Sequence, residues 1–178
     1  MKENFDRAFI ETLKHEGGWA DHPRDPGGMT NLGVTKRVWE DYTGRRVTEA
    51  DMRALTPEMV KPLYRDWYWN KVGGNDLPSG VDFVVYDFAV NSGPARAVRF
   101  AQKISGATQD GAMGPKTLAK IKEYCDQNGE EFFIKAYSDA RLAYLEGLST
   151  FRLFGRGWTN RVNDVEHYAS VMSRTEVA

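Results

Sequence analysis

Residues 4–35 read NFDRAFIETLKHEGGWADHPRDPGGMTNLGVT and carry the signals of a helix followed by a short hairpin. Apolar side chains recur at helical spacing after Asn4, a suitable N-cap, so we expect a helix over about 5–16. The glycine pair that follows ends such a helix. A Pro-Gly-Gly turn and an alternating Leu-Gly-Val stretch then predict a small hairpin within 19–35.

The rest of the chain has the pattern of consecutive helices. Segment 81–90 is apolar except for Asp82 and Asp87, which predicts a buried helix. A cap at Thr56 predicts a helix that contains Pro62, so this helix is either kinked or begins later. Further helix starts are expected at the capping box of Thr48 and Asp51, at Pro94, at Pro115, near Glu130 and near Gly157. We therefore predict a mainly α fold with one small β-hairpin after the first helix.

Composition limits the class of protein. The chain has 178 residues, of which 41% are hydrophobic and 28% charged, and a mean hydropathy of −0.57, so it is neither disordered nor an integral membrane protein. Its one cysteine cannot form an intramolecular disulfide, and with three scattered histidines we expect no metal site and no cofactor. A net charge of −1 gives no reason to expect a nucleic-acid partner.

Two further expectations concern organisation and location. The Gly-Gly-Asn-Asp stretch before residue 77 is the best candidate boundary, which divides the chain into a lobe of residues 1–75 and a helical lobe of residues 76–178, packed as one structural unit. The first twenty residues carry charges every few positions and lack the apolar segment of a signal peptide. We expect synthesis in the cytoplasm without membrane insertion.

Glu16 is the first candidate catalytic residue. It continues the apolar stripe of Phe9 and Leu13 into the last helical turn, where both burial and the negative end of the helix dipole favour a protonated carboxyl. A general acid needs that state near neutral pH. The alternative is that Glu16 reaches solvent or pairs with Lys14 or His15.

The hairpin supplies the candidate partners of Glu16. Asp25 lies nine positions after it, and Thr30 and Asn31 follow in the hairpin. An acid on one wall and water-holding groups on the other form a sugar-cleaving cleft, and inverting glycosidases place two carboxyls roughly 6.5–9.5 Å apart. Asp25 either activates that water or only stabilises the turn before Pro-Gly-Gly, and Asp21 is a weaker candidate base. Thr30 and Asn31 either hold the water or bond the hairpin backbone.

These motifs resemble a known family. The spacing from Glu16 to Asp25 and on to Thr30 or Asn31 is similar to that of inverting phage lysozymes. HEGGW at residues 15–19 and DPGGMTNLGVT at residues 25–35 resemble the signature of glycoside hydrolase family 108, the N-acetylmuramidases of phage endolysins and of bacterial lysis and secretion loci. Family members usually carry Tyr where this chain has Trp19. Four later motifs resemble the accompanying peptidoglycan-binding region: LPSGVDF at 77–83, DFAVNSGP at 87–94, DGAMGPKT at 110–117 and FGRGW at 154–158.

The resemblance implies a lysozyme-like fold and a bacteriolytic muramidase that cleaves the β-1,4 bond between N-acetylmuramic acid and N-acetylglucosamine in peptidoglycan. It implies Glu16 as general acid, with Trp19, Thr30 and Asn31 at the substrate. The alternatives are a lytic transglycosylase, which needs no second carboxylate, and a non-catalytic wall-binding or secretion-assisting protein. We expect a monomer that reaches the wall in the periplasm through a holin or another pore, or on lysis; a phage, prophage or bacterial origin is equally compatible.

Overall fold

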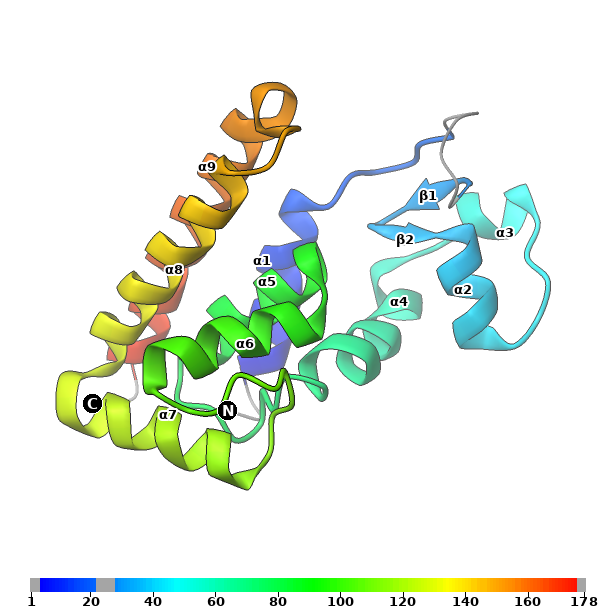
Figure 1. Cartoon of the computed structure of the whole chain (residues 1–178). Coiled ribbons are helices and arrows are strands. Elements are labelled where there is room, and N and C mark those ends of the chain that lie inside the picture. The colour runs from blue at the N-terminus through cyan, green and yellow to red at the C-terminus, as the bar shows by residue number, and fades with distance from the viewer. Residues whose placement is uncertain (1–3, 22–27, 176–178) are drawn as a thin grey trace.

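The computed structural model describes residues 4–21 and 28–175, and in them the chain is mainly helical, as predicted (Figure 1). The small hairpin predicted after the first helix is present. The elements in chain order are α1 (Phe5–His15), β1 (Thr30–Asn31), β2 (Val34–Thr35), α2 (Lys36–Thr43), α3 (Glu49–Arg53), α4 (Pro57–Tyr64), the π-helix η2 (Arg65–Trp69), α5 (Val81–Ser92), α6 (Pro94–Ser105), α7 (Pro115–Asn128), α8 (Glu130–Glu146) and α9 (Phe151–Arg174).

Helix α5 lies at the centre of the larger group of helices. It contacts α1, α6, α8, α9 and η2, and every residue from Val81 to Ala89 is buried. The hairpin, α2 and α3 lie to one side, and the chain crosses to them after α1 (Figure 1). The apolar 81–90 segment is thus the buried helix that its composition predicts. None of the helices in the described part of the chain is both long and apolar enough to span a bilayer.

Several predicted helix starts are confirmed. Thr48 and Asp51 form the capping box of α3, and the Thr56 hydroxyl accepts a hydrogen bond from the Met59 amide at the start of α4. Helix α4 does not begin late: it starts at Pro57 and runs through Pro62, and the π-helix η2 follows directly.

Three local expectations were wrong or incomplete. The Asn4 side chain does not cap α1; its Nδ2 donates to Ser79 Oγ at 2.8 Å and to Asp82 Oδ2 at 2.9 Å, because burial beside α5 offers it better acceptors. Helix α9 begins at Phe151 rather than near Gly157, and the Phe151 ring packs where a side chain at Gly155 would lie. Helix α2 was not predicted.

A buried ion cluster ties four helices together. Asp87 of α5 is fully buried, and its carboxylate accepts from Thr12 of α1, from Arg141 of α8 at 2.8 Å and from Arg161 of α9 at 2.9 and 3.0 Å. Burial alone would raise the pKa of Asp87, but the charges of Arg161 and Arg141 outweigh it and hold that pKa well below its ordinary value. Asp87 is therefore a charged group in the core that depends on both arginines.

We expect Asp87→Ala to lower the free energy of unfolding by about 3–5 kcal/mol, because it leaves the buried Arg141 guanidinium without its counter-charge. The exposed Asp139, which pairs with Lys135 along α8, is the matched control. Asp139→Ala should change the same quantity by about 0.5 kcal/mol or less. Urea denaturation followed by circular dichroism measures both, and equal losses would contradict a special role for the buried carboxylate.

Candidate active site

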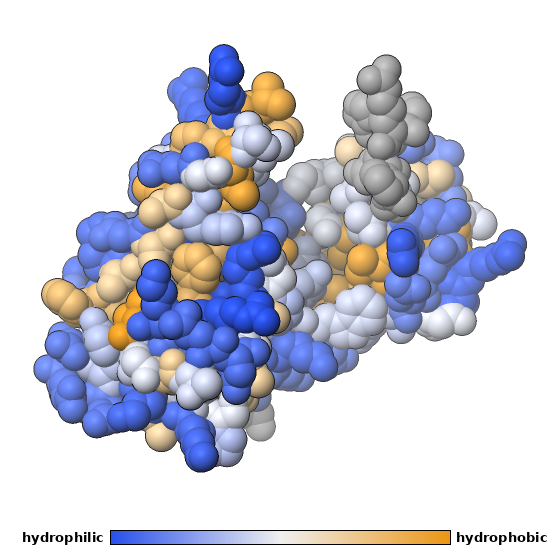
Figure 2. Space-filling view, viewed as in Figure 1, coloured by the Kyte–Doolittle hydropathy of each residue, from blue (hydrophilic) through white to orange (hydrophobic). Residues whose placement is uncertain are grey.

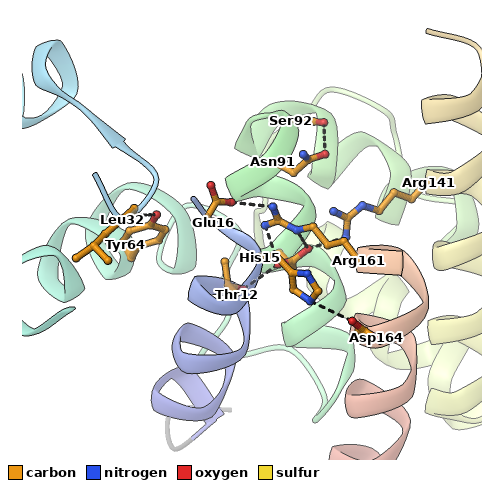
Figure 3. A network of polar contacts seen from close by, with 11 residues as sticks. Thr12, His15, Glu16, Leu32, Tyr64, Asn91, Ser92, Arg141, Arg161 and Asp164 are labelled. Atoms are coloured by element: carbon orange, nitrogen blue, oxygen red, sulfur yellow. Dashed lines mark hydrogen bonds and ion pairs between the residues drawn. The ribbon is translucent and has the colours of Figure 1, made fainter. Parts of the chain in front are cut away.

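Glu16 is predicted in the last turn of the first helix. In the structure α1 ends at His15, and Glu16 is the residue that follows. Its backbone is extended, with φ −81° and ψ 140°, and its amide still bonds to the Thr12 carbonyl at 3.3 Å. The side chain is 19% exposed, so it is neither in the core nor free in solvent. The change from helix to extended backbone points Glu16 into the space between α1, α9 and the hairpin (Figure 3).

The hairpin turn closes one side of this space. Leu32 and Gly33 connect the two strands, and both have positive φ, 51° and 74°, as a two-residue hairpin turn of type I′ requires. The Leu32 carbonyl accepts from the Tyr64 hydroxyl at 2.8 Å. A Cβ added to Gly33 would lie 2.7 Å from Glu16 Oε2, so only glycine lets the turn approach the carboxyl this closely.

Arg161 closes the opposite side. Its Nη1 lies 2.8 Å from Glu16 Oε1, while its Nε and Nη2 hold Asp87. The Arg161 side chain is only 8% exposed, because two carboxylates compensate its charge inside the protein. Lys14 and His15 are not the partners of Glu16; Lys14 bonds Glu11, and His15 lies 3.6 Å from Asp164.

Two tyrosines lie near enough to this carboxyl for its charge to affect their pKa values. Burial raises the pKa of Tyr64, and the nearby charge of Glu16 raises it further. Tyr68 shows the same two effects in the same order, so its pKa is also raised. Both phenols therefore remain neutral hydrogen-bond donors over the whole physiological pH range.

The geometry fits an acid that is held in one orientation. Oε1 is held by the guanidinium and Oε2 lies towards the hairpin turn, so the two carboxyl oxygens have different surroundings. Figure 2 shows a hollow in the surface. It lies between the end at which α8 leads into α9 and the part of the molecule that contains the hairpin, α2 and α3. In the described ranges, no group of three or more His, Cys, Asp or Glu side chains could hold a metal ion.

The structure places the other predicted site residues on or near the hairpin. Thr30 pairs through its backbone with Ala20, with N···O distances of 2.7 and 2.8 Å. The buried Asn31 donates from Nδ2 to the Met52 carbonyl at 2.9 Å, which fixes the hairpin to α3. Trp19 is half-buried, and the Arg53 guanidinium stacks on its ring at 4.0 Å. Asp25 lies outside the described residues.

Three residues of this site were not found from the sequence. Asp87 carried a signal, since it is a charged residue inside an apolar helix, and such a residue needs a buried counter-charge. Tyr64 lies in the predicted helix that contains Pro62, and nothing in the sequence distinguishes it as a site residue. Nothing in the sequence connects Arg161 to Glu16, which are 145 positions apart.

Two family models and a solved structure match this chain. The family model described as glycosyl hydrolase 108 matches residues 9–93, and the model described as predicted peptidoglycan domain matches residues 96–163. The solved structure entitled "Structure of Brucella abortus SagA" is 46% identical, with a TM-score of 0.85 and coverage of 98% of both chains. No curated protein matches the chain.

These matches extend over nearly the whole chain, and Glu16, the hairpin and Tyr64 all fall within the first of the two models. At 46% identity over 98% of both chains, the solved relative shows common family membership as well as a common fold. The chain belongs to the glycosyl hydrolase 108 family and is a glycoside hydrolase that acts on peptidoglycan.

Proposed function

We propose that this enzyme is an N-acetylmuramidase that cleaves the β-1,4 bond between N-acetylmuramic acid and N-acetylglucosamine, with Glu16 as the general acid. The observation that supports this role is the position of one partly exposed carboxyl between the hairpin turn and the Arg161 guanidinium. A glycosidase needs such an acid to protonate the leaving oxygen.

Arg161 has a defined part in this proposal. In this proposal Glu16 donates its proton to the glycosidic oxygen from Oε2, while Oε1 accepts the Nη1 hydrogen bond. As that proton passes to the glycosidic oxygen, negative charge develops on Glu16 at a distance of 2.8 Å from Nη1. A fixed positive charge at that place stabilises the carboxylate that the transfer creates. Asp87 positions Arg161 through two hydrogen bonds and does not contact substrate.

Asp25 is proposed as the base that activates the attacking water. Its place in the sequence before the hairpin supports this role, since the hairpin turn itself lies against Glu16. A carboxylate on that side acts as base across a water molecule in an inverting enzyme. If Asp25 is only a turn residue, the 6-hydroxyl of the substrate replaces water and the enzyme is a lytic transglycosylase.

We propose the periplasmic face of the bacterial wall as the place of action, because the substrate is found there. In this proposal the protein is an endolysin-like monomer that reaches the wall through a holin or another pore, or on lysis.

Glu16→Gln should lower the rate of wall hydrolysis at least roughly 100-fold, because the amide cannot donate the proton. The measurement is the release of reducing ends from purified peptidoglycan. Glu11→Gln on the same helix is the control and should keep the activity, since Glu11 bonds Lys14. A folded Glu16→Gln protein with nearly wild-type activity would exclude the assignment.

Gly33→Ala tests the close approach of the hairpin to Glu16. The new Cβ would lie 2.5 Å from the Tyr64 hydroxyl and 2.7 Å from Glu16 Oε2, so the carboxyl or the turn must move. We expect a loss of activity of roughly tenfold or more, since small misplacements of a catalytic group are costly. Gly44→Ala is matched in backbone strain, with φ 68° against 74°, but meets no atom within 4 Å. Equal activities of the two variants would show that the approach does not position Glu16.

Asp25→Asn separates the base from the turn residue. Asn forms the same side-chain turn but lacks the charge that activates water, so a base predicts severe loss of activity at unchanged melting temperature. A turn residue predicts the opposite ranking, with Ala damaging and Asn nearly silent. We expect the loss with Asn, together with a reducing muramic acid of inverted anomeric configuration. Full activity of Asp25→Asn, or 1,6-anhydro products from the wild type, would support the transglycosylase.

A further inference from the structure

A groove between α6 and α8 is lined by residues that have no part in the proposed catalysis. It encloses about 720 Å³, and its apolar wall is formed by Phe100, Ile104, Ala140, Ala143 and Tyr144. Figure 2 shows this apolar surface where α8 meets α6, with hydrophilic surface beside it. We call these residues, together with Arg99, Lys103 and Gln109 at the edge, the α6–α8 groove.

The wall of the groove is rigid. The Phe100 and Tyr144 rings meet edge to face at 5.7 Å, and both contact the buried Phe88 ring, at 5.2 and 6.0 Å. The Arg96 guanidinium lies over Tyr144 at 4.9 Å. Side chains anchored on a core residue lose little further freedom when a ligand binds, so the groove is a preformed surface.

The edge of the groove is positively charged. Residues 94–105 of α6 contain Arg96, Arg99 and Lys103 and no acidic residue. All three cations are exposed and recur at helical spacing, which places them along one side of α6. The nearby Asp110 accepts hydrogen bonds on Oδ1 from Gln102 of α6 and from the Ala112 amide at 2.7 and 2.9 Å, and the charge of Arg99 helps to lower its pKa. Three cations therefore lie near one carboxylate, and the edge keeps a positive balance.

We infer that the α6–α8 groove binds the stem peptide of peptidoglycan, as a recognition site separate from the cleft at Glu16. This inference rests on the proposed action on peptidoglycan, and all the groove residues lie within the 96–163 match to the predicted peptidoglycan domain. The stem peptide combines methyl side chains with free carboxylates, which complement an apolar wall beside Arg99 and Lys103. A bare glycan strand needs many neutral hydrogen-bond partners, and among the groove side chains only Gln109 and the Tyr144 hydroxyl are of that kind.

Binding of a synthetic stem tetrapeptide to the full-length protein tests the inference. The peptide has no glycosidic bond, so the result does not depend on whether Glu16 is the catalytic acid. We expect saturable binding by the wild type and roughly tenfold weaker binding by the double variant Arg99→Gln/Lys103→Gln, which removes the two charges that line the groove. Ala143→Phe should weaken binding similarly, because Ala143 is exposed in the free protein and the larger ring fills the groove without disturbing the core.

The controls separate the groove from the rest of the protein. Lys71→Gln/Lys122→Gln removes two exposed lysines elsewhere and should leave the dissociation constant unchanged. Cleavage of glycan strands freed of peptide should be the same in both groove variants and the wild type, while Glu16→Gln abolishes it. Absence of saturable tetrapeptide binding by the wild type would overturn the inference. Groove variants that bind the tetrapeptide like the wild type, at equal melting temperature, would also overturn it. The same holds if peptide-free glycan displaces the bound tetrapeptide as well as intact peptidoglycan does.

Discussion

A carboxylate enclosed in a helical core is stable only when positive charge and hydrogen-bond donors surround it, and Asp87 meets that condition with Arg141, Arg161 and Thr12. These partners come from three different helices, so the carboxylate fixes where α1, α8 and α9 lie around α5. Arg161 has one nitrogen left over from this task, and that nitrogen binds Glu16. The position of the candidate acid therefore depends on a charge that lies inside the core.

This arrangement joins the two matched parts of the chain at one site. Glu16 and the hairpin lie in the region matched by the glycosyl hydrolase model, whereas Arg161 lies in the region matched by the peptidoglycan model. The second region therefore contributes Arg161 to the proposed chemistry, in addition to its match with a peptidoglycan domain. The α6–α8 groove lies wholly within that second region. The proposed recognition of peptide uses α6 and α8, whereas the proposed cleavage of glycan uses Glu16 after α1, the hairpin turn and Arg161 of α9.

Opposite the rigid ion cluster stands a hairpin of only two residues in each strand. It is held from outside: Asn31 binds the carbonyl of Met52 in α3, and Tyr64 of α4 binds the carbonyl of Leu32. The left-handed backbone of Leu32 and Gly33 turns that carbonyl towards Tyr64 and brings the glycine against Glu16. A short hairpin is marginal by itself, so these contacts give the turn the precision that a catalytic site needs.

Much of the fold follows from local sequence. Periodicity, caps and prolines predicted the first helix, the hairpin, the helix capped by Thr48 and the helices that start at Pro57, Pro94 and Pro115, because these signals act over a few residues. The start of α9 was predicted too late, near Gly157 instead of Phe151. Gly155 lies inside the helix, where the lack of a side chain leaves room for the Phe151 ring. Glu16 was identified from its place after an apolar stripe, but its partner was not. The contact with Arg161 joins residues 145 positions apart, and it forms only because α5 brings Asp87 between α1 and α9, so tertiary packing alone decided it.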